Sequence, residues 1–285
     1  MAFYIPVLGA LALAIGTIIQ KKILSKKKIG IQLYQSAEFF AIVLAMLPFV
    51  YFFWQASPEA LQFKNIFIFG LVILFSIAAN LFTFYSMKWE KVTNLEPAKI
   101  LEPLFIILLA IFFSFFIDSG LYERNLKVII PALIAGGALI FSHLKKHHLT
   151  FNKYFISAIL GSFFFALELV ISRLILDFYS PITFYFIRCF SIFLISLIIF
   201  RPNFKKLDKK SIIHFFIIGV IWAAYRIIIY WGYIELGVIF TTLVIMLGPI
   251  FIYLFAWKFL KEKINWKNIV ASIIIVGCVV YAVLS

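Results

Sequence analysis

Long apolar runs follow one another along almost the whole chain, and they restrict its fold more than any other feature. The runs are Ala2–Gln20, Ile31–Trp54, Ile66–Met87, Leu95–Ile117, Val128–Phe141, Tyr154–Leu176, Ile182–Phe200, Ile212–Ile234, Val238–Trp257 and Ile269–Leu284. A membrane-spanning helix needs about 20 mainly apolar residues, and these runs meet or approach that length. The fifth and the tenth are the shortest. The sequence therefore predicts an all-α integral membrane protein with ten transmembrane helices.

The composition excludes a water-soluble fold. Hydrophobic residues make up 65% of the chain and charged residues only 13%, whereas a soluble domain is roughly 45–50% apolar and about 25% charged. A water-facing surface could not be covered with so few polar groups. The runs are apolar on every face and lack the alternation of membrane β-strands, so helices are expected in every span.

The basic residues gather in alternate loops. Nineteen of the 26 Lys and Arg residues follow odd-numbered runs, and four follow even-numbered runs. Cytoplasmic loops are enriched in Lys and Arg, so both chain ends are expected to face away from the cytoplasm in a multi-pass protein of the inner (cytoplasmic) membrane. The formal net charge of +14 resides in these loop clusters rather than on one basic face, which argues against nucleic acid as a partner.

A sequence block near the end of the fourth run recurs in the ninth. Leu101–Phe113 reads LEPLFIILLAIFF and Leu247–Phe259 reads LGPIFIYLFAWKF, with seven of thirteen positions identical. The offset of 146 residues pairs Pro103 with Pro249, and Asn80 with Arg226. The chain is thus expected to contain two five-helix repeats, residues 1–144 and 145–285, within one integrated membrane domain. Because five is odd, the second repeat must be inverted relative to the first.

These features resemble the drug/metabolite transporter superfamily, and specifically its ten-helix EamA-type members. The resemblance rests on the two five-helix halves, on the Leu-x-Pro block in both copies, and on the Phe-Leu-Lys-Glu run at Phe259–Glu262. It implies a membrane transporter. The sequence departs from the family pattern at Lys99 and Glu102, where such proteins usually carry apolar or small residues, and in a longer connection after the fourth run.

Ionisable residues inside the apolar runs are candidates for function, because a charge near the bilayer centre costs roughly 2.5–3.5 kcal/mol on insertion scales. These residues are Glu38, Lys99, Glu102, Glu168, Arg188 and Arg226. Two alternatives compete with a functional role. Glu168 could form a structural ion pair with Arg188 or Arg226, and the fourth helix could begin at Pro97, which would leave Lys99 and Glu102 paired near the membrane surface.

Two further patterns complete the expected substrate site. Roughly helical spacing relates Tyr225, Arg226, Tyr230 and Tyr233, so a guanidinium and aromatic rings would share one stripe that can hold a carboxylate. Pro103 and Pro249 each remove a backbone hydrogen bond and are expected to kink their helices near a midplane site. The predicted substrate-binding residues are Glu38, Asn80, Glu102, Glu168, Arg188, Tyr225, Arg226 and Tyr230.

The function predicted from these residues is secondary transport of a small charged or zwitterionic metabolite, such as an amino acid, by alternating access. The alternative is an intramembrane enzyme acting on a lipid-linked or membrane-embedded substrate. The sequence shows no phosphate-binding loop and no metal-ligand set within the spans, so neither catalysis nor a cofactor or bound metal is expected. The expected partners are the solute, membrane lipids and a coupling proton, in a monomer or homodimer.

Overall fold

The computed structural model describes all residues except 1–3, 91, 118–119, 144–151 and 252–265. The described part is helical, and the sole strand-like contact within it is an isolated bridge between Ala56 and Tyr179. The long helices are α1 (Tyr4–Leu24), α2 (Ile31–Phe53), α3 (Phe63–Trp89), α5 (Leu101–Phe116), α6 (Leu126–His143), α7 (Lys153–Ser172), α8 (Pro181–Phe200), α9 (Lys209–Glu235) and α12 (Trp266–Leu284). The shorter elements are α4 (Val92–Lys99), α10 (Val238–Ile245) and the 3-10 turns Pro58–Leu61, Leu176–Phe178 and Phe204–Lys206.

Eight helical segments in the described part of the chain are long and apolar enough to cross a membrane. They are α1, α2, α3, residues Pro97–Phe116 of the fourth run, α7, α8, α9 and α12. The segments Leu126–Ser142 and Val238–Phe251 are apolar but shorter, and part of the predicted ninth span lies outside the described residues. The predicted tenth span Ile269–Leu284 corresponds to α12, which begins three residues earlier, at Trp266.

Local sequence determines where several helices begin. Asn152 precedes α7, and its side-chain oxygen accepts hydrogen bonds from the backbone N–H groups of Tyr154 and Phe155 at 3.0 and 2.8 Å. Ser180 accepts from the N–H of Thr183 before α8, whose first residue is Pro181. Such caps satisfy N–H groups that have no partner inside the helix, and lipid offers no other partner for them.

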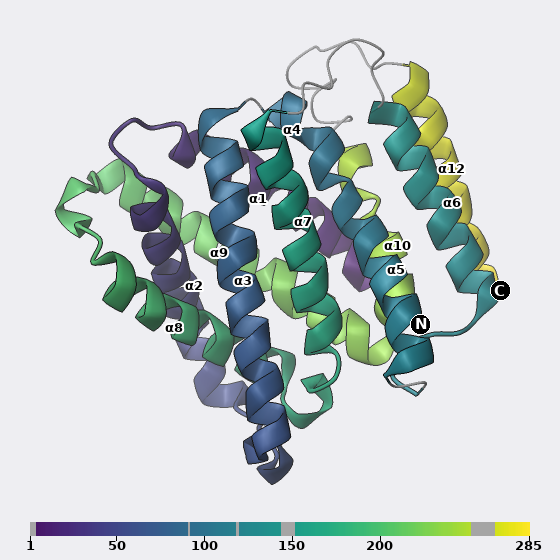
Figure 1. Cartoon of the computed structure of the whole chain (residues 1–285), viewed down its shortest axis with the longest axis horizontal. Coiled ribbons are helices and arrows are strands. Elements are labelled where there is room, and N and C mark those ends of the chain that lie inside the picture. Colours follow the sequence, from purple (N-terminus) through teal and green to yellow (C-terminus); the bar gives the residue numbers. More distant parts are fainter. Residues whose placement is uncertain (1–3, 91, 118–119, 144–151, 252–265) are drawn as a thin grey trace.

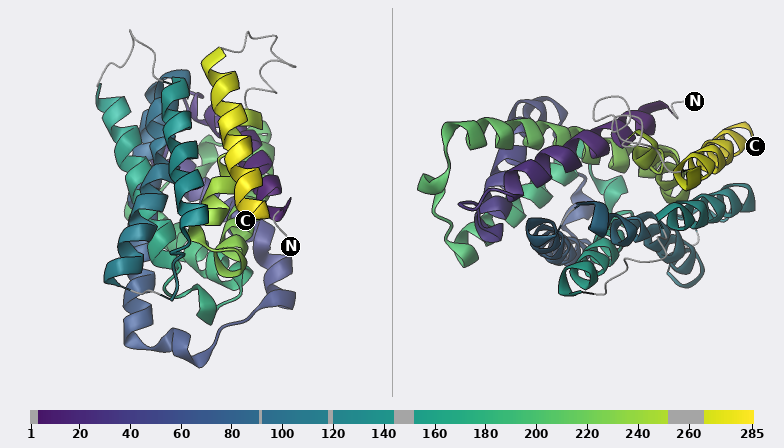
Figure 2. Two further views of the ribbon diagram at one scale, coloured as in Figure 1. Left: turned by 90° about the vertical axis from the view of Figure 1, so that its right-hand side faces the viewer. Right: turned by 90° about the horizontal axis from the view of Figure 1, so that it is seen from above.

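The helices run roughly side by side between two ends of an elongated bundle (Figure 2). Figure 1 shows α6 and α12 along one edge and α2 and α8 at the opposite side. Between these edges α3 packs against α7, and α1 packs against α9. Gly161 of α7 allows a close approach to α3, because a β-carbon at this position would lie 2.5 Å from the Thr83 hydroxyl oxygen.

Polar contacts tie the loops together at each end. At the lysine-rich end, the Lys88 ammonium donates to the Ile29 carbonyl at 2.7 Å, and Lys26 donates to the Ser211 hydroxyl at 2.7 Å. At the opposite end, the Ser57 N–H donates to the Phe178 carbonyl at 2.9 Å. The loops that follow odd and even spans therefore gather at opposite ends wherever the structure describes them.

The loop after α5 contacts the start of α10 through Glu123. The carboxylate accepts hydrogen bonds from the backbone N–H groups of Ile239 at 3.1 Å and Phe240 at 3.0 Å, next to Gly237. Burial raises the pKa of the Glu123 carboxyl, and the backbone N–H groups oppose that rise. The contact links two segments that are more than 100 residues apart in the sequence, since Glu123 precedes Ile239 by 116 positions and Phe240 by 117.

Replacing Gly237 by alanine is expected to destabilise the protein by about 1–3 kcal/mol. Gly237 has a backbone φ angle of +90°, which residues with a side chain rarely adopt. A β-carbon added at this position would also lie 2.1 Å from a Glu123 oxygen. Thermal unfolding in detergent would measure the effect. Gly277→Ala is the matched control because nothing lies within 4 Å of its β-carbon position. Equal unfolding temperatures for the two variants would contradict the prediction.

Candidate functional site

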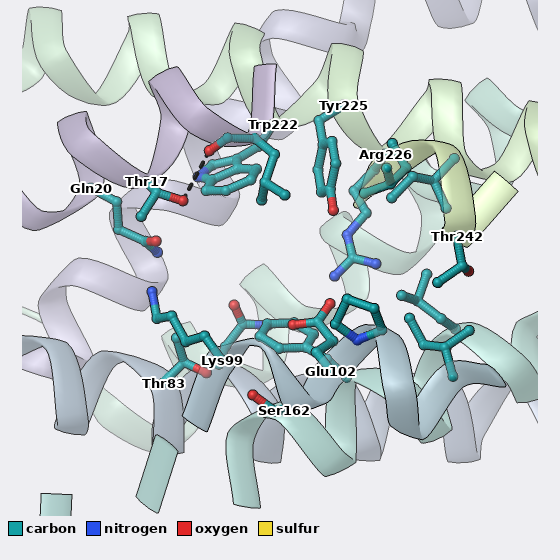
Figure 3. A pocket seen from close by; sticks show the side chains of 18 of the residues that line it. Thr17, Gln20, Thr83, Lys99, Glu102, Ser162, Trp222, Tyr225, Arg226 and Thr242 are labelled. Atoms are coloured by element: carbon teal, nitrogen blue, oxygen red, sulfur yellow. Dashed lines mark hydrogen bonds between the residues drawn. The ribbon is translucent and has the colours of Figure 1, made fainter. Parts of the chain in front are cut away.

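A central cavity of about 190 Å³ lies between the helices. Figure 3 shows Thr17, Gln20, Trp222, Tyr225 and Arg226 on one side of it, and Thr83, Lys99, Glu102 and Ser162 on the other. Small-molecule pockets for drug-sized ligands are typically about 300–1,000 Å³, so this volume suits a smaller solute. Its lining combines apolar side chains with a few charged ones, which is typical of a binding site.

Two helix breaks border the cavity at equivalent positions of the repeated block. Helix α4 ends at Lys99, four residues before Pro103, and α10 ends at Ile245, four residues before Pro249. Proline cannot donate the hydrogen bond that would continue the helix to the carbonyl four residues earlier. Both prolines line the cavity. The structure places Pro103 in the first turn of α5, after the break, rather than inside one continuous helix.

The fourth run does not begin at Pro97. Helix α4 begins at Val92, so Pro97 lies inside it. Lys99 and Glu102 both line the central cavity (Figure 3), whereas the alternative interpretation expected them near the membrane surface. Residues 252–259 of the second block, and the Phe259–Glu262 run, lie outside the described residues.

Glu168 stands at the centre of an ionic cluster beside the cavity. The side chain is fully buried, and one carboxylate oxygen lies 3.3 Å from Arg188 Nη2 and 3.4 Å from Arg226 Nη1. The other oxygen accepts a hydrogen bond from the Tyr230 hydroxyl at 2.8 Å. The sequence left open which arginine would pair with Glu168, and the structure shows that both do.

Arg188 is held on several sides. Its Nε donates to the Ser76 hydroxyl at 2.7 Å, and its Nη1 donates to the Tyr230 hydroxyl at 2.8 Å. The guanidinium also lies over the Tyr185 ring, 5.4 Å from the ring centroid. With Glu168 as the counter-ion, these contacts use most of its donors. Arg188 therefore has few donors left for a solute.

Arg226 is held far less completely. No hydrogen bond joins its guanidinium to the residues that the structure describes, and its Nη1 is buried without a hydrogen-bond partner. The guanidinium lies near the rings of Phe165 and Tyr225, 5.2 and 5.8 Å from their centroids. Figure 3 shows it directed into the cavity, across from Glu102. The N–H donors that do not face Glu168 are therefore available to an anionic group.

The remaining predicted residues divide into two groups. Glu38, Asn80, Glu102 and Tyr225 line the cavity, together with both arginines. Asn80 is turned partly toward its own helix, since its amide donates to the Ser76 carbonyl at 2.7 Å. Glu168 and Tyr230 do not line the cavity. Glu168 forms ion pairs with both arginines, and the Tyr230 hydroxyl accepts a hydrogen bond from Arg188.

The second half of the chain is similar in sequence to a known protein family. The model of the EamA-like transporter family matches residues 152–284. Residues 152–284 are thus similar to the EamA-like transporter family. The predicted resemblance is confirmed for these residues, and similarity to this family of the drug/metabolite transporter superfamily implies a membrane transporter. No curated protein matches the chain.

The crystal structure of another protein has the same fold along nearly the whole chain. Its TM-score is 0.68 at 15% identity, and the alignment covers 99% of this chain and 95% of the other. The fold found in the EamA-like half is therefore part of an arrangement that extends through residues outside the family match. At this identity the likeness describes the fold alone.

Several residues that line the cavity were absent from the predicted set. From the EamA-like half these are Ser162, Phe165, Tyr185, Trp222, Tyr233 and Thr242, and from the first half Thr17, Gln20, Thr83 and Lys99. Tyr233 belongs to the predicted stripe of α9, and Trp222 lies about one turn before Arg226 on the same helix, so that pattern could have identified both. Gln20 is the last residue of the first apolar run and carries little signal by itself. Among the described residues, no group of histidine, cysteine, aspartate or glutamate could hold a metal ion.

Proposed function

We propose that this chain is a secondary transporter that moves a small charged or zwitterionic organic solute, of the amino-acid type, across the cytoplasmic membrane. The observation that carries the proposal is the Arg226 guanidinium, which faces a central cavity without a hydrogen bond to the described residues. A carboxylate bound there would accept two parallel N–H bonds. Glu102 and Tyr225, which line the same space, would receive the ammonium group and the apolar part of the solute.

We further propose that transport proceeds by alternating access of ten spans in two inverted halves, residues 1–144 and 145–285. Helix packing supports this symmetry. If the halves correspond, the α3–α7 contact is equivalent to the α9–α1 contact, and both are extensive. The α2–α8 and α6–α12 pairs would each lie across the symmetry axis, and both also pack together. Such repeats transport solutes by moving one half against the other around a fixed site.

Flux measurements in proteoliposomes test the proposed function. The purified protein would be reconstituted and supplied with a panel of radiolabelled amino acids, organic acids, amines and sugars, with and without a pH gradient. Uptake of a zwitterionic or anionic member above that of protein-free vesicles is expected. Saturable uptake of uncharged solutes alone would contradict the assignment of solute class. No feature of the described residues favours the alternative of an intramembrane enzyme.

The charge distribution also supports a proposed orientation, in which the lysine-rich end faces the cytoplasm. Ser285→Cys, in a background with Cys189 and Cys278 replaced by alanine, is expected to react with a membrane-impermeant maleimide added to intact cells. Ser25→Cys, in the loop between α1 and α2 at the lysine-rich end, is the control and should stay protected until the cells are opened. The reverse labelling pattern would overturn the orientation.

A further inference from the structure

Glu38 is a second buried acid in the cavity wall, apart from the Glu168 cluster. It lies on α2, its exposed fraction is 2%, and it lines the cavity. The Tyr34 hydroxyl, one turn earlier on the same helix, donates to a Glu38 oxygen at 2.9 Å. Trp222 of α9 lines the same cavity. The Tyr34 hydroxyl is a neutral donor.

No ion pair joins Glu38 to a lysine or arginine in the described part of the chain. This distinguishes it from Glu168, which is matched by two guanidinium groups. A buried carboxylate without a cation is costly, and the usual remedies are a proton or a bound cationic group. An intramembrane acid in this setting is able to exchange a proton with whichever side the cavity faces.

The other charged groups that line the cavity lie on different helices. They are Lys99 on α4, Glu102 on α5, Arg188 on α8 and Arg226 on α9, while α1 and α3 contribute the uncharged Gln20 and Asn80. Helix α2 packs against α9, and Glu38 lines the same cavity as the candidate solute-binding arginine, Arg226 of α9. A change in the charge of Glu38 can therefore act on Arg226 across the cavity and through the contact between these two helices.

We propose that Glu38 is the proton-binding site that couples solute movement to the proton gradient; this inference rests on the proposed transport function. Water on one side of the membrane supplies the proton to a Glu38 carboxylate oxygen, and water on the other side receives it after the cavity has reoriented. Only O–H bonds form and break. Protonation removes a buried negative charge from α2, which packs directly against α9, and this loss of charge favours reorientation.

Infrared difference spectroscopy of the reconstituted protein tests proton binding without any solute. A titration of pH is expected to show the carbonyl stretch of a protonated carboxylic acid, and Glu38→Gln, which keeps the shape and the Tyr34 contact, should lose that band. Glu59→Gln, an exposed acid outside the spans, is the matched control and should retain it. An unchanged band in Glu38→Gln would overturn the inference.

A transport measurement adds the coupling test. Proteoliposomes containing the pH-sensitive dye pyranine would receive a mixture of the twenty common L-amino acids. The unmodified protein should move protons together with amino acids, whereas Glu38→Gln should lose the dye response and retain exchange of labelled amino acids across the membrane. A dye response in Glu38→Gln equal to that of the unmodified protein would overturn the inference. If the unmodified protein moves no amino acid, the proposed function fails, and the infrared result alone decides the role of Glu38.

Discussion

Arg226→Lys is expected to lower solute transport about ten- to hundredfold while the protein stays folded. Lysine keeps the positive charge opposite Glu168 but cannot present the planar pair of donors that fits a carboxylate. The loss of one charge-assisted hydrogen bond costs about 1.5–3 kcal/mol, which corresponds to that range. Initial rates of uptake in proteoliposomes, divided by the amount of monodisperse protein, would measure the effect.

The structure also separates the two possible roles of Arg226. In Arg226→Ala, Glu168 still has Arg188 at 3.3 Å and the Tyr230 hydroxyl at 2.8 Å, so most of the ionic cluster remains. Transport should therefore fall much more than stability does. If Arg226→Ala unfolds as readily as a variant that removes Arg188, and Arg226→Lys transports at the normal rate, then Arg226 has a structural role only.

The largest loss of stability is expected from Glu168→Ala, at about 3–5 kcal/mol. The change leaves two buried guanidinium groups without an acid, because both arginines share the same carboxylate oxygen of Glu168. It also removes the acceptor of the Tyr230 hydroxyl, which itself orients Arg188. The free energy of unfolding, measured by denaturant titration in mixed micelles, would report the loss.

Two variants control this measurement. Glu235→Ala removes an exposed acid at the end of α9 and should change stability by less than about 0.5 kcal/mol. Glu168→Gln preserves the size of the side chain and an acceptor for Tyr230, so it should lie between the alanine variant and the unmodified protein. A Glu168→Ala protein as stable as Glu235→Ala would show that the cluster contributes little to folding.

Most helix positions could be read from the sequence because the requirement for a span is local. Every backbone N–H and C=O group in lipid needs a partner within its own helix, and about 20 apolar residues satisfy this without help from the rest of the chain. The predicted run Ile31–Trp54 and α2 (Ile31–Phe53) differ by one residue. The repeated block likewise identified the two prolines beside the helix breaks from residue identity alone.

The tertiary structure decided what those helices bring together. The sequence singled out Glu168, Arg188 and Arg226, but which arginine pairs with Glu168 depends on how α7, α8 and α9 cross, and no local pattern records that. The same crossings place Gln20 and Lys99 in one cavity with Arg226, although Gln20 is an ordinary residue at its position in the sequence. Apolar runs determine that a helix forms, because lipid acts on each segment separately. Partners of buried polar groups are chosen by contacts between distant segments, and only the folded bundle fixes those contacts.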